Sequence, residues 1–119
     1  MRALIAEHPW IARFLAHGLT ERGHETDVAH DGHRAFELGR GGSHQAIILA
    51  TALPGKHGVA VAQELRRAGV SSPILLLTAG EHEAEAAMRA SGANGYLAKP
   101  FSFDQLLHRL RALDAMAAW

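Results

Sequence analysis

The feature that most constrains the fold of this chain is a strict alternation of short apolar runs with amphipathic segments. The apolar runs are four or five residues long, which suits buried strands and falls far short of a membrane span; only residues 25–29 form a poorer, more polar strand. The segments between them place apolar residues at helical spacing, as Ile11, Phe14 and Leu15 do. The expected strands are 3–6, 25–29, 46–50, 74–78 and 95–98, and the expected helices are 10–22, 33–40, 59–68, 83–91 and 104–118. Such alternation predicts right-handed crossovers and a parallel sheet covered by helices on both faces.

Composition narrows the class of protein further. A chain of 119 residues, 48% of them apolar, is long enough for one core and too apolar to be disordered. We therefore expect a single domain over residues 1–119. The formal charge of zero gives no electrostatic footprint for nucleic acid and no reason to bind an anionic membrane. The absence of cysteine fits a reducing cytosol, so we expect a cytoplasmic protein.

The carboxyl ends of the expected strands carry the candidate functional residues, because that edge is where open α/β sheets place their chemistry. Polar side chains end or follow three of the strands: Glu7, His8, Thr78 and Lys99. The third strand instead ends in Ala50, just before a Leu-Pro-Gly turn. A methyl group is neither a nucleophile nor a metal ligand. Thr51 is the next residue, but alternation along a strand directs it to the other side.

Several short motifs occur in a fixed order along the chain. They are Val28-Ala29-His30-Asp31-Gly32, Leu53-Pro54-Gly55-Lys56-His57-Gly58, Leu75-Leu76-Leu77-Thr78-Ala79, Gly92-Ala93-Asn94-Gly95-Tyr96, Tyr96-Leu97-Ala98-Lys99-Pro100-Phe101 and Ser102-Phe103-Asp104-Gln105-Leu106-Leu107. Together they resemble the receiver domain of two-component response regulators over essentially the whole chain. The last motif resembles receivers that carry a winged-helix DNA-binding domain. The resemblance implies a flavodoxin-like, doubly wound sheet of five parallel strands in the order 2-1-3-4-5, with five helices.

The resemblance also shows which functional residues are missing. Receivers accept a phosphoryl group on an aspartate that ends the third strand, and here Ala50 stands at that position. Two acidic residues after the first strand hold Mg²⁺ in the family; Glu7 keeps the first position and His8 occupies the second. Thr78 and Lys99 match the two residues that bind phosphoryl oxygens. Since Mg²⁺ prefers carboxylate and other oxygen ligands, we expect its binding to be weak or absent, with no cofactor and no catalytic residue.

These losses predict an atypical, phosphorylation-independent receiver, or pseudo-receiver. It would act as a protein-interaction or dimerisation module in bacterial signal transduction or transcription regulation. DNA would be bound only through an additional C-terminal domain. An enzyme is disfavoured, because no nucleophile–base pair and no glycine-rich phosphate loop follows the first strand.

The alternative is a receiver that senses a small molecule or metal in the vacated pocket, where Ala50 leaves more room than aspartate. His8, His57 and His82 lie on loops expected near that pocket. Their spacing matches no compact metal-ligand motif, so we expect no specific metal site.

The face around the last strand is the candidate dimer surface that the resemblance implies. In winged-helix receivers acidic and basic pairs join two copies there, and Tyr96 stands at the position of a switch aromatic. The candidate residues here are Glu85, Arg89, Asn94, Arg109 and Arg111. Asn94 and Gly95 replace the usual acidic pair, and Glu85 stands where a basic residue is common, so we expect an altered network. The apolar tail from Leu113 to Trp119 either covers a partner surface, packs on its own domain or continues toward a second domain.

Three expectations concern charges. A buried ammonium without a partner is costly, so we expect Lys99 to pair with Glu7 at the shared edge of the sheet. We expect Glu7 to lie near enough to solvent to hydrate without Lys99, so that Glu7→Gln costs more stability than Lys99→Met. Glu83 and Glu85 begin the fourth helix, where acids suit the helix dipole, and need no further role.

Overall fold

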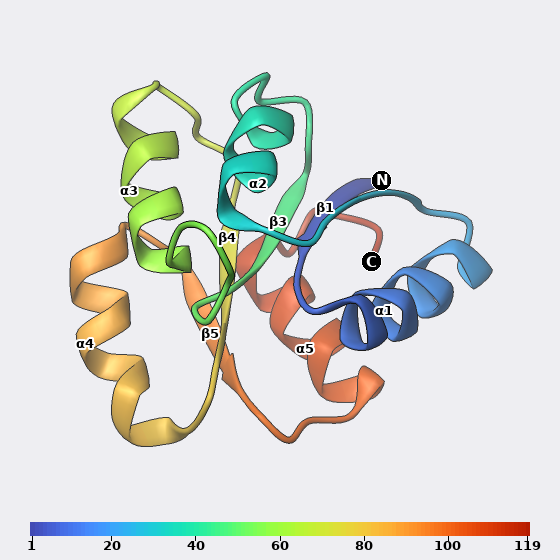
Figure 1. The fold of residues 1–119 in the computed structure, drawn as a ribbon. Helices are drawn as coiled ribbons and strands as arrows, with labels where there is room; N and C mark the ends of the chain where they lie inside the picture. Colours follow the sequence, from blue (N-terminus) through green and yellow to red (C-terminus); the bar gives the residue numbers. More distant parts are fainter.

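A computed structural model describes all 119 residues as a five-stranded parallel sheet flanked by five helices (Figure 1). The strands are β1 (Arg2–Ala6), β2 (Glu25–Ala29), β3 (Ala46–Ala50), β4 (Ile74–Thr78) and β5 (Gly95–Ala98). The helices are α1 (Pro9–Glu21), α2 (Gly32–Gly39), α3 (Gly58–Arg67), α4 (Glu81–Ser91) and α5 (Phe103–Leu113). The strand order is β2-β1-β3-β4-β5. The predicted flavodoxin-like fold and its topology are therefore confirmed.

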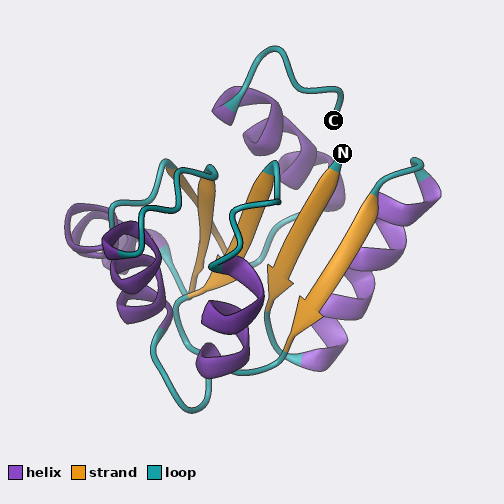
Figure 2. Ribbon diagram, turned by 90° about the horizontal axis from the view of Figure 1, so that it is seen from above, coloured by secondary structure: helices purple, strands orange, loops and turns teal.

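The helices form two layers around the sheet. Helices α1 and α5 cover one face, while α2, α3 and α4 follow one another across the other face (Figures 1 and 2). The rings of Phe14 and Phe103 meet edge to face with centroids 6.2 Å apart, which joins α1 to α5. Every residue of β3 and β4 is buried, as expected for central strands covered on both faces. None of the helices combines the length and the apolar character needed to cross a lipid bilayer.

The register of the strands brings their carboxyl ends to one edge. Ala50 of β3 lies beside Leu77 of β4, and Thr78 lies beside Ala98 of β5. On the other side of β3, Ala6 of β1 lies beside Leu49. The residues that end or follow these strands consequently share one rim of the sheet.

The predicted boundaries hold within two residues, with one exception. Helix α5 was expected to reach residue 118, but it ends at Leu113, and Asp114 adopts an extended conformation with φ −152° and ψ 100°. The chain then turns back and buries Trp119, which is 5% exposed. The apolar tail favours a longer helix locally, and burial of one large side chain outweighs that preference.

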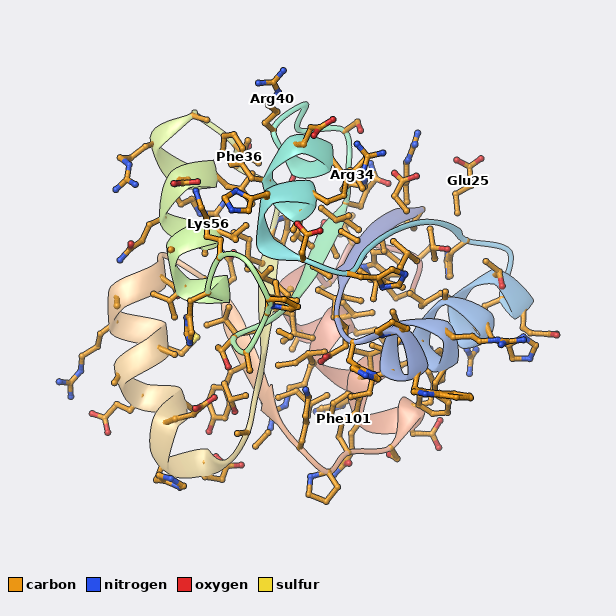
Figure 3. All side chains as sticks on the ribbon, in the orientation of Figure 1. Glu25, Arg34, Phe36, Arg40, Lys56 and Phe101 are labelled. Carbon is orange, nitrogen blue, oxygen red and sulfur yellow. The ribbon has the colours of Figure 1, made fainter.

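Two glycines allow the loop after β3 to pack closely. A Cβ atom on Gly58, the first residue of α3, would lie 2.0 Å from the carbonyl oxygen of Ala50. A Cβ atom on Gly32 would lie 2.1 Å from the carbonyl oxygen of Lys56. Lys56 is labelled on this loop in Figure 3, and its Nζ atom lies 2.6 Å from Glu64 Oε1 of α3. The end of β3 is thus held tightly against α2 and α3.

Candidate functional site

The rim formed by the strand ends is the candidate site, and it gathers Glu7, Ala50, Thr78 and Lys99 as predicted from the sequence. Ala50 has no exposed surface, and the start of α3 packs against its carbonyl oxygen. Its side chain is a methyl group, so the end of β3 offers no side-chain oxygen to the site.

An ion pair occupies the rim. Lys99 Nζ lies 2.7 Å from Glu7 Oε2, which confirms the predicted pairing. Oε2 makes no aligned hydrogen bond, so the contact with Lys99 is essentially electrostatic. Glu7 Oε1 accepts a hydrogen bond from the backbone N–H of His8 at 2.7 Å. Both oxygens of the carboxylate are therefore engaged by groups of this chain.

The burial of this pair is the reverse of the prediction. Glu7 was expected to lie near solvent, but it is only 1% exposed. The Lys99 side chain is 30% exposed. The lysine stem is long enough to keep its head near water, whereas the short carboxylate follows directly on a buried strand. The buried Glu7 carboxylate therefore depends on the ion pair for charge compensation more than the partly exposed Lys99 ammonium does.

His8 serves the helix that follows it. Its side chain is exposed, and its Nδ1 accepts a hydrogen bond from the backbone N–H of Trp10 at 3.3 Å. Pro9 then occupies the first helical position, where a missing N–H costs nothing. His57 caps α3 in the same way, through Val59 N at 3.2 Å. The residue in the second acidic position thus acts as a helix cap.

The donor set does not fit Mg²⁺. Of the positions that the resemblance assigns to the ion and the phosphoryl group, only Glu7 carries a carboxylate. That carboxylate already faces the Lys99 ammonium, whereas Mg²⁺ requires several oxygen ligands in octahedral geometry. The structure contains no cluster of three or more His, Asp or Glu side chains arranged to hold a metal.

The two hydroxyl groups near Ala50 have partners of their own. Thr78 is fully buried and donates to the carbonyl oxygen of Gly80 at 3.1 Å. Thr51 donates to Glu83 Oε1 at 2.8 Å and is 3% exposed. Thr51 is thus tied to α4, which agrees with its predicted orientation away from the site.

Glu83 has a role that sequence reasoning missed. Its Oε1 accepts hydrogen bonds from the backbone N–H of Ala79 and from Thr51, both at 2.8 Å. These bonds, that from Ala79 first, hold the pKa of Glu83 below its usual value. Thr51 and Glu83 are 32 residues apart, so no local pattern could have paired them. The expectation that Glu83 serves only the helix dipole was wrong.

The four cavities of the structure lie outside the centre of the rim. None is lined by Glu7, His8, Ala50 or Thr78. Lys99 lines a depression of about 270 Å³ next to Phe101. The largest groove, about 770 Å³, runs between α1 and the end of β2. The space vacated at position 50 is thus closed.

Tyr96 is half-buried and turned toward the start of α4. Its hydroxyl donates to Glu81 Oε2 at 2.7 Å, and this hydrogen bond raises the pKa of Tyr96. The guanidinium of Arg109 lies 5.4 Å from the centre of the ring and donates to the Tyr96 carbonyl oxygen. The residue at the switch position is therefore anchored at both its side chain and its backbone.

The other candidate dimer residues also have partners within the chain. Arg89 and Glu85 pair with each other across one turn of α4. Arg111 donates to the carbonyl oxygen of Trp119 at 3.3 Å. The structure does not bring these charges into one network.

Asn94 is directed toward the opposite end of the sheet. Its Oδ1 accepts from Arg66 Nη2 and from the backbone N–H of Ile74, both at 2.8 Å. Arg66 also donates to the carbonyl oxygens of Val70, Ser72 and Gly92. Asn94 and Arg66 therefore join the loop that precedes β4 to the loop between α4 and β5.

Comparison with known proteins identifies the family. The profile of the response regulator receiver domain matches residues 3–111. Over 116 residues the chain is 43% identical to the transcriptional regulatory protein TcrA of Mycobacterium tuberculosis. This match covers 96% of this chain and 46% of TcrA. The chain is 40% identical to the transcriptional regulatory protein CusR of Escherichia coli, covering 95% of this chain and 51% of CusR. The chain thus spans about half the length of these curated relatives.

Solved structures agree with this assignment. A putative response regulator from Chloroflexus aurantiacus superposes with a TM-score of 0.86 at 31% identity, covering 96% of this chain and 97% of that one. The chemotaxis protein CheY4 of Vibrio cholerae superposes with a TM-score of 0.85 at 28% identity, covering 94% and 97%. The family match, the identities and the strand order lead to one conclusion: this chain belongs to the receiver domain family of two-component response regulators.

Proposed function

We propose that this receiver works without phosphorylation, as a protein-interaction module in bacterial signal transduction or transcription regulation. The observation that carries the proposal is Ala50 at the end of β3, beside a rim already occupied by the Glu7–Lys99 ion pair. Phosphoryl transfer needs an acceptor oxygen in line with the donor and metal ions to neutralise the developing charge. The rim offers neither.

The hydroxyl groups of two residues around the rim are held in place by hydrogen bonds within the chain. Thr78 is bonded to Gly80, and Tyr96 is bonded to Glu81. In a phosphorylated receiver the corresponding hydroxyl would turn toward the phosphoryl group. Here a phosphoryl group would find no acceptor at position 50, so the signalling activity of the domain must depend on what the domain binds.

Exposed aromatic side chains favour a protein partner. Trp10 is 72% exposed and Phe14 is 53% exposed, one turn apart on α1. Large exposed aromatic groups are typical of protein interfaces. The partner in our proposal is another protein or a second copy of this chain. By analogy with the transcriptional regulatory proteins that it resembles, contact with DNA would require a further domain.

Incubation with acetyl phosphate and Mg²⁺ tests the proposal. We expect the intact mass of the chain to remain unchanged, while a receiver that keeps the aspartate gains one phosphoryl group in the same reaction. We also expect the molecular mass from light scattering to be the same with and without the donor. A stoichiometric gain of phosphate, or a donor-dependent change of oligomeric state, would overturn the proposal.

A further inference from the structure

The segment after α5 folds back on the domain as a compact strap of residues 114–119, called here the C-terminal strap. Its turn is closed by two hydrogen bonds to Asp114: Ala117 N donates to the carbonyl oxygen at 3.1 Å, and Met116 N donates to Oδ1 at 3.0 Å. This turn leaves Met116 93% exposed and carries Trp119 into the core cluster, where it is 5% exposed. The strap is therefore docked through a single large side chain.

The seat of Trp119 lies at the end of the sheet away from the rim. The indole packs on the ring of His24, in the turn between α1 and β2, with centroids 5.0 Å apart and planes tilted by 54°. Arg111 of α5 holds the main-chain oxygen of Trp119. In both ribbon views the C-terminal end lies close to the N-terminal end (Figures 1 and 2).

The charges around His24 are positive. The amino group of Met1 lies 3.3 Å from His24 Nδ1, and Arg22 precedes it on the same turn. From α5, Arg111 reaches the same seat through Trp119. Glu25 is the next residue, but its side chain projects into solvent (Figure 3), and no carboxylate lies within ion-pair distance of His24. An additional proton on His24 would therefore face the Met1 amine and Arg22, with no carboxylate close enough to form an ion pair with it.

We propose that residues 114–119 form a detachable strap whose docking is governed by the protonation of His24. The neutral imidazole packs against the indole of Trp119 and lies within hydrogen-bond distance of the Met1 amino group. The imidazolium would instead be partly buried beside two cations. Release would expose Trp119 and the apolar surface beneath it, which is the kind of anchor that protein partners bind. The strap thus goes beyond the proposed function, because it does not involve the rim.

The direction of the pH dependence follows from the surroundings of His24. Burial beside Trp119, then the Met1 amine and Arg22, lower the pKa of His24 from its ordinary value of 6.5. The docked state therefore binds fewer protons than the released state. Docking is strongest above about pH 6.5 and weakens progressively as the pH falls below that value.

Tryptophan fluorescence tests the strap directly. The chain has two tryptophans, and Trp10→Phe leaves Trp119 as the only one. We expect its emission to shift to the red, and its quenching by acrylamide to increase, as the pH is lowered from about 7.5 to about 5.5, because the released fraction grows. The far-UV circular dichroism should not change over this range, because the sheet and helices stay folded.

His24→Phe in the Trp10→Phe background is the matched control. Phenylalanine keeps a ring under the indole and cannot be protonated, so Trp119 should stay shielded at both pH values. Accessibility of Trp119 that is independent of pH in Trp10→Phe would overturn the proposal. So would an equal pH response in the control, or a loss of helical signal that coincides with exposure, because the latter indicates general unfolding.

Discussion

At the scale of single residues, the site is defined by the unequal burial of two opposite charges. Glu7 is 1% exposed, and the side chain of Lys99 is 30% exposed. Removing one partner of a buried ion pair leaves the other charge without compensation, and the cost depends on whether water can replace the partner. Water can reach Lys99 and cannot reach Glu7.

Lys99→Met should therefore destabilise the domain more than Glu7→Gln. We expect about 3 kcal/mol for Lys99→Met, because a buried carboxylate is left unpaired. Glu7→Gln should cost about 1 kcal/mol, since the amide oxygen still accepts from His8 N and the ammonium can hydrate. Urea denaturation of both variants and of the double variant measures these costs and their coupling. Equal costs for the single variants, or a coupling of zero, would contradict this account of the rim.

Restoring the aspartate alone should not restore phosphorylation. Ala50→Asp supplies the acceptor oxygen, but Glu7 would remain the single acid after β1 and is already paired with Lys99. We expect weak or no labelling of Ala50→Asp by acetyl phosphate and Mg²⁺, and clearly more for Ala50→Asp with His8→Asp. Aspartate is also a good N-cap, so the second change preserves the start of α1.

Intact mass spectrometry measures this labelling, with His8→Asp alone as the control that lacks an acceptor. Rapid and complete labelling of Ala50→Asp by itself would show that His8 is no obstacle.

At the scale of elements, the first turn of α4 is held by side-chain hydrogen bonds to residues outside the helix. Its cap, Gly80, has no side chain to bond to the helix. Glu83 instead binds Ala79 N and Thr51, and Glu81 binds Tyr96. One carboxylate thus connects α4 to the end of β3, and the other connects it to β5.

The hydrogen bonds that Glu83 accepts should make the stability of the domain sensitive to acid. Its pKa is lowered in the folded state, so its contribution is complete above the unfolded value of about 4.3 and is lost as the pH falls below it. We expect the wild type to lose more stability than Glu83→Gln between neutral pH and about pH 3.5, as measured by urea denaturation.

Glu85→Gln is the control for this comparison, because Glu85 is an exposed carboxylate on the same helix. It should keep the acid sensitivity of the wild type. If Glu83→Gln and Glu85→Gln respond alike, Glu83 does not hold α4 in the way described.

At the scale of the whole molecule, the C-terminal strap joins the end of α5 to the turn between α1 and β2. The strap contributes one buried side chain, Trp119, and one almost fully exposed apolar side chain, Met116. The two residues lie on the same short segment, one buried and the other exposed. They therefore form a natural pair for measuring what docking contributes to stability.

Trp119→Ala should lower the free energy of unfolding by about 2–4 kcal/mol at neutral pH, because it removes a large buried side chain. Met116→Ala should change it by less than about 0.5 kcal/mol, as expected for an exposed position. Chemical denaturation of both variants provides the measurement. Similar effects of the two substitutions would mean that the strap is not docked in solution.

The alternation of apolar runs was sufficient to predict a parallel sheet covered by helices on both faces, whereas the strand order was predicted from the resemblance of the ordered motifs to receiver domains. The ion pair was also predictable, since a lysine ending a buried strand needs a partner. Which member of the pair is buried was not, because that depends on how far each side chain reaches from its strand. The end of α5 was missed for a similar reason: the pattern of residues 113–118 is local, whereas the seat of Trp119 is formed by distant His24.

The buried ion pair also sets the cost of placing an acid at position 50. In Ala50→Asp a second carboxylate would approach a lysine that already pairs with Glu7, next to the close contact between Ala50 and Gly58. The new charge would be buried while the oxygen ligands for Mg²⁺ remain incomplete. The single substitution should therefore lower the stability of the domain, and only the second substitution, His8→Asp, adds an oxygen ligand in return.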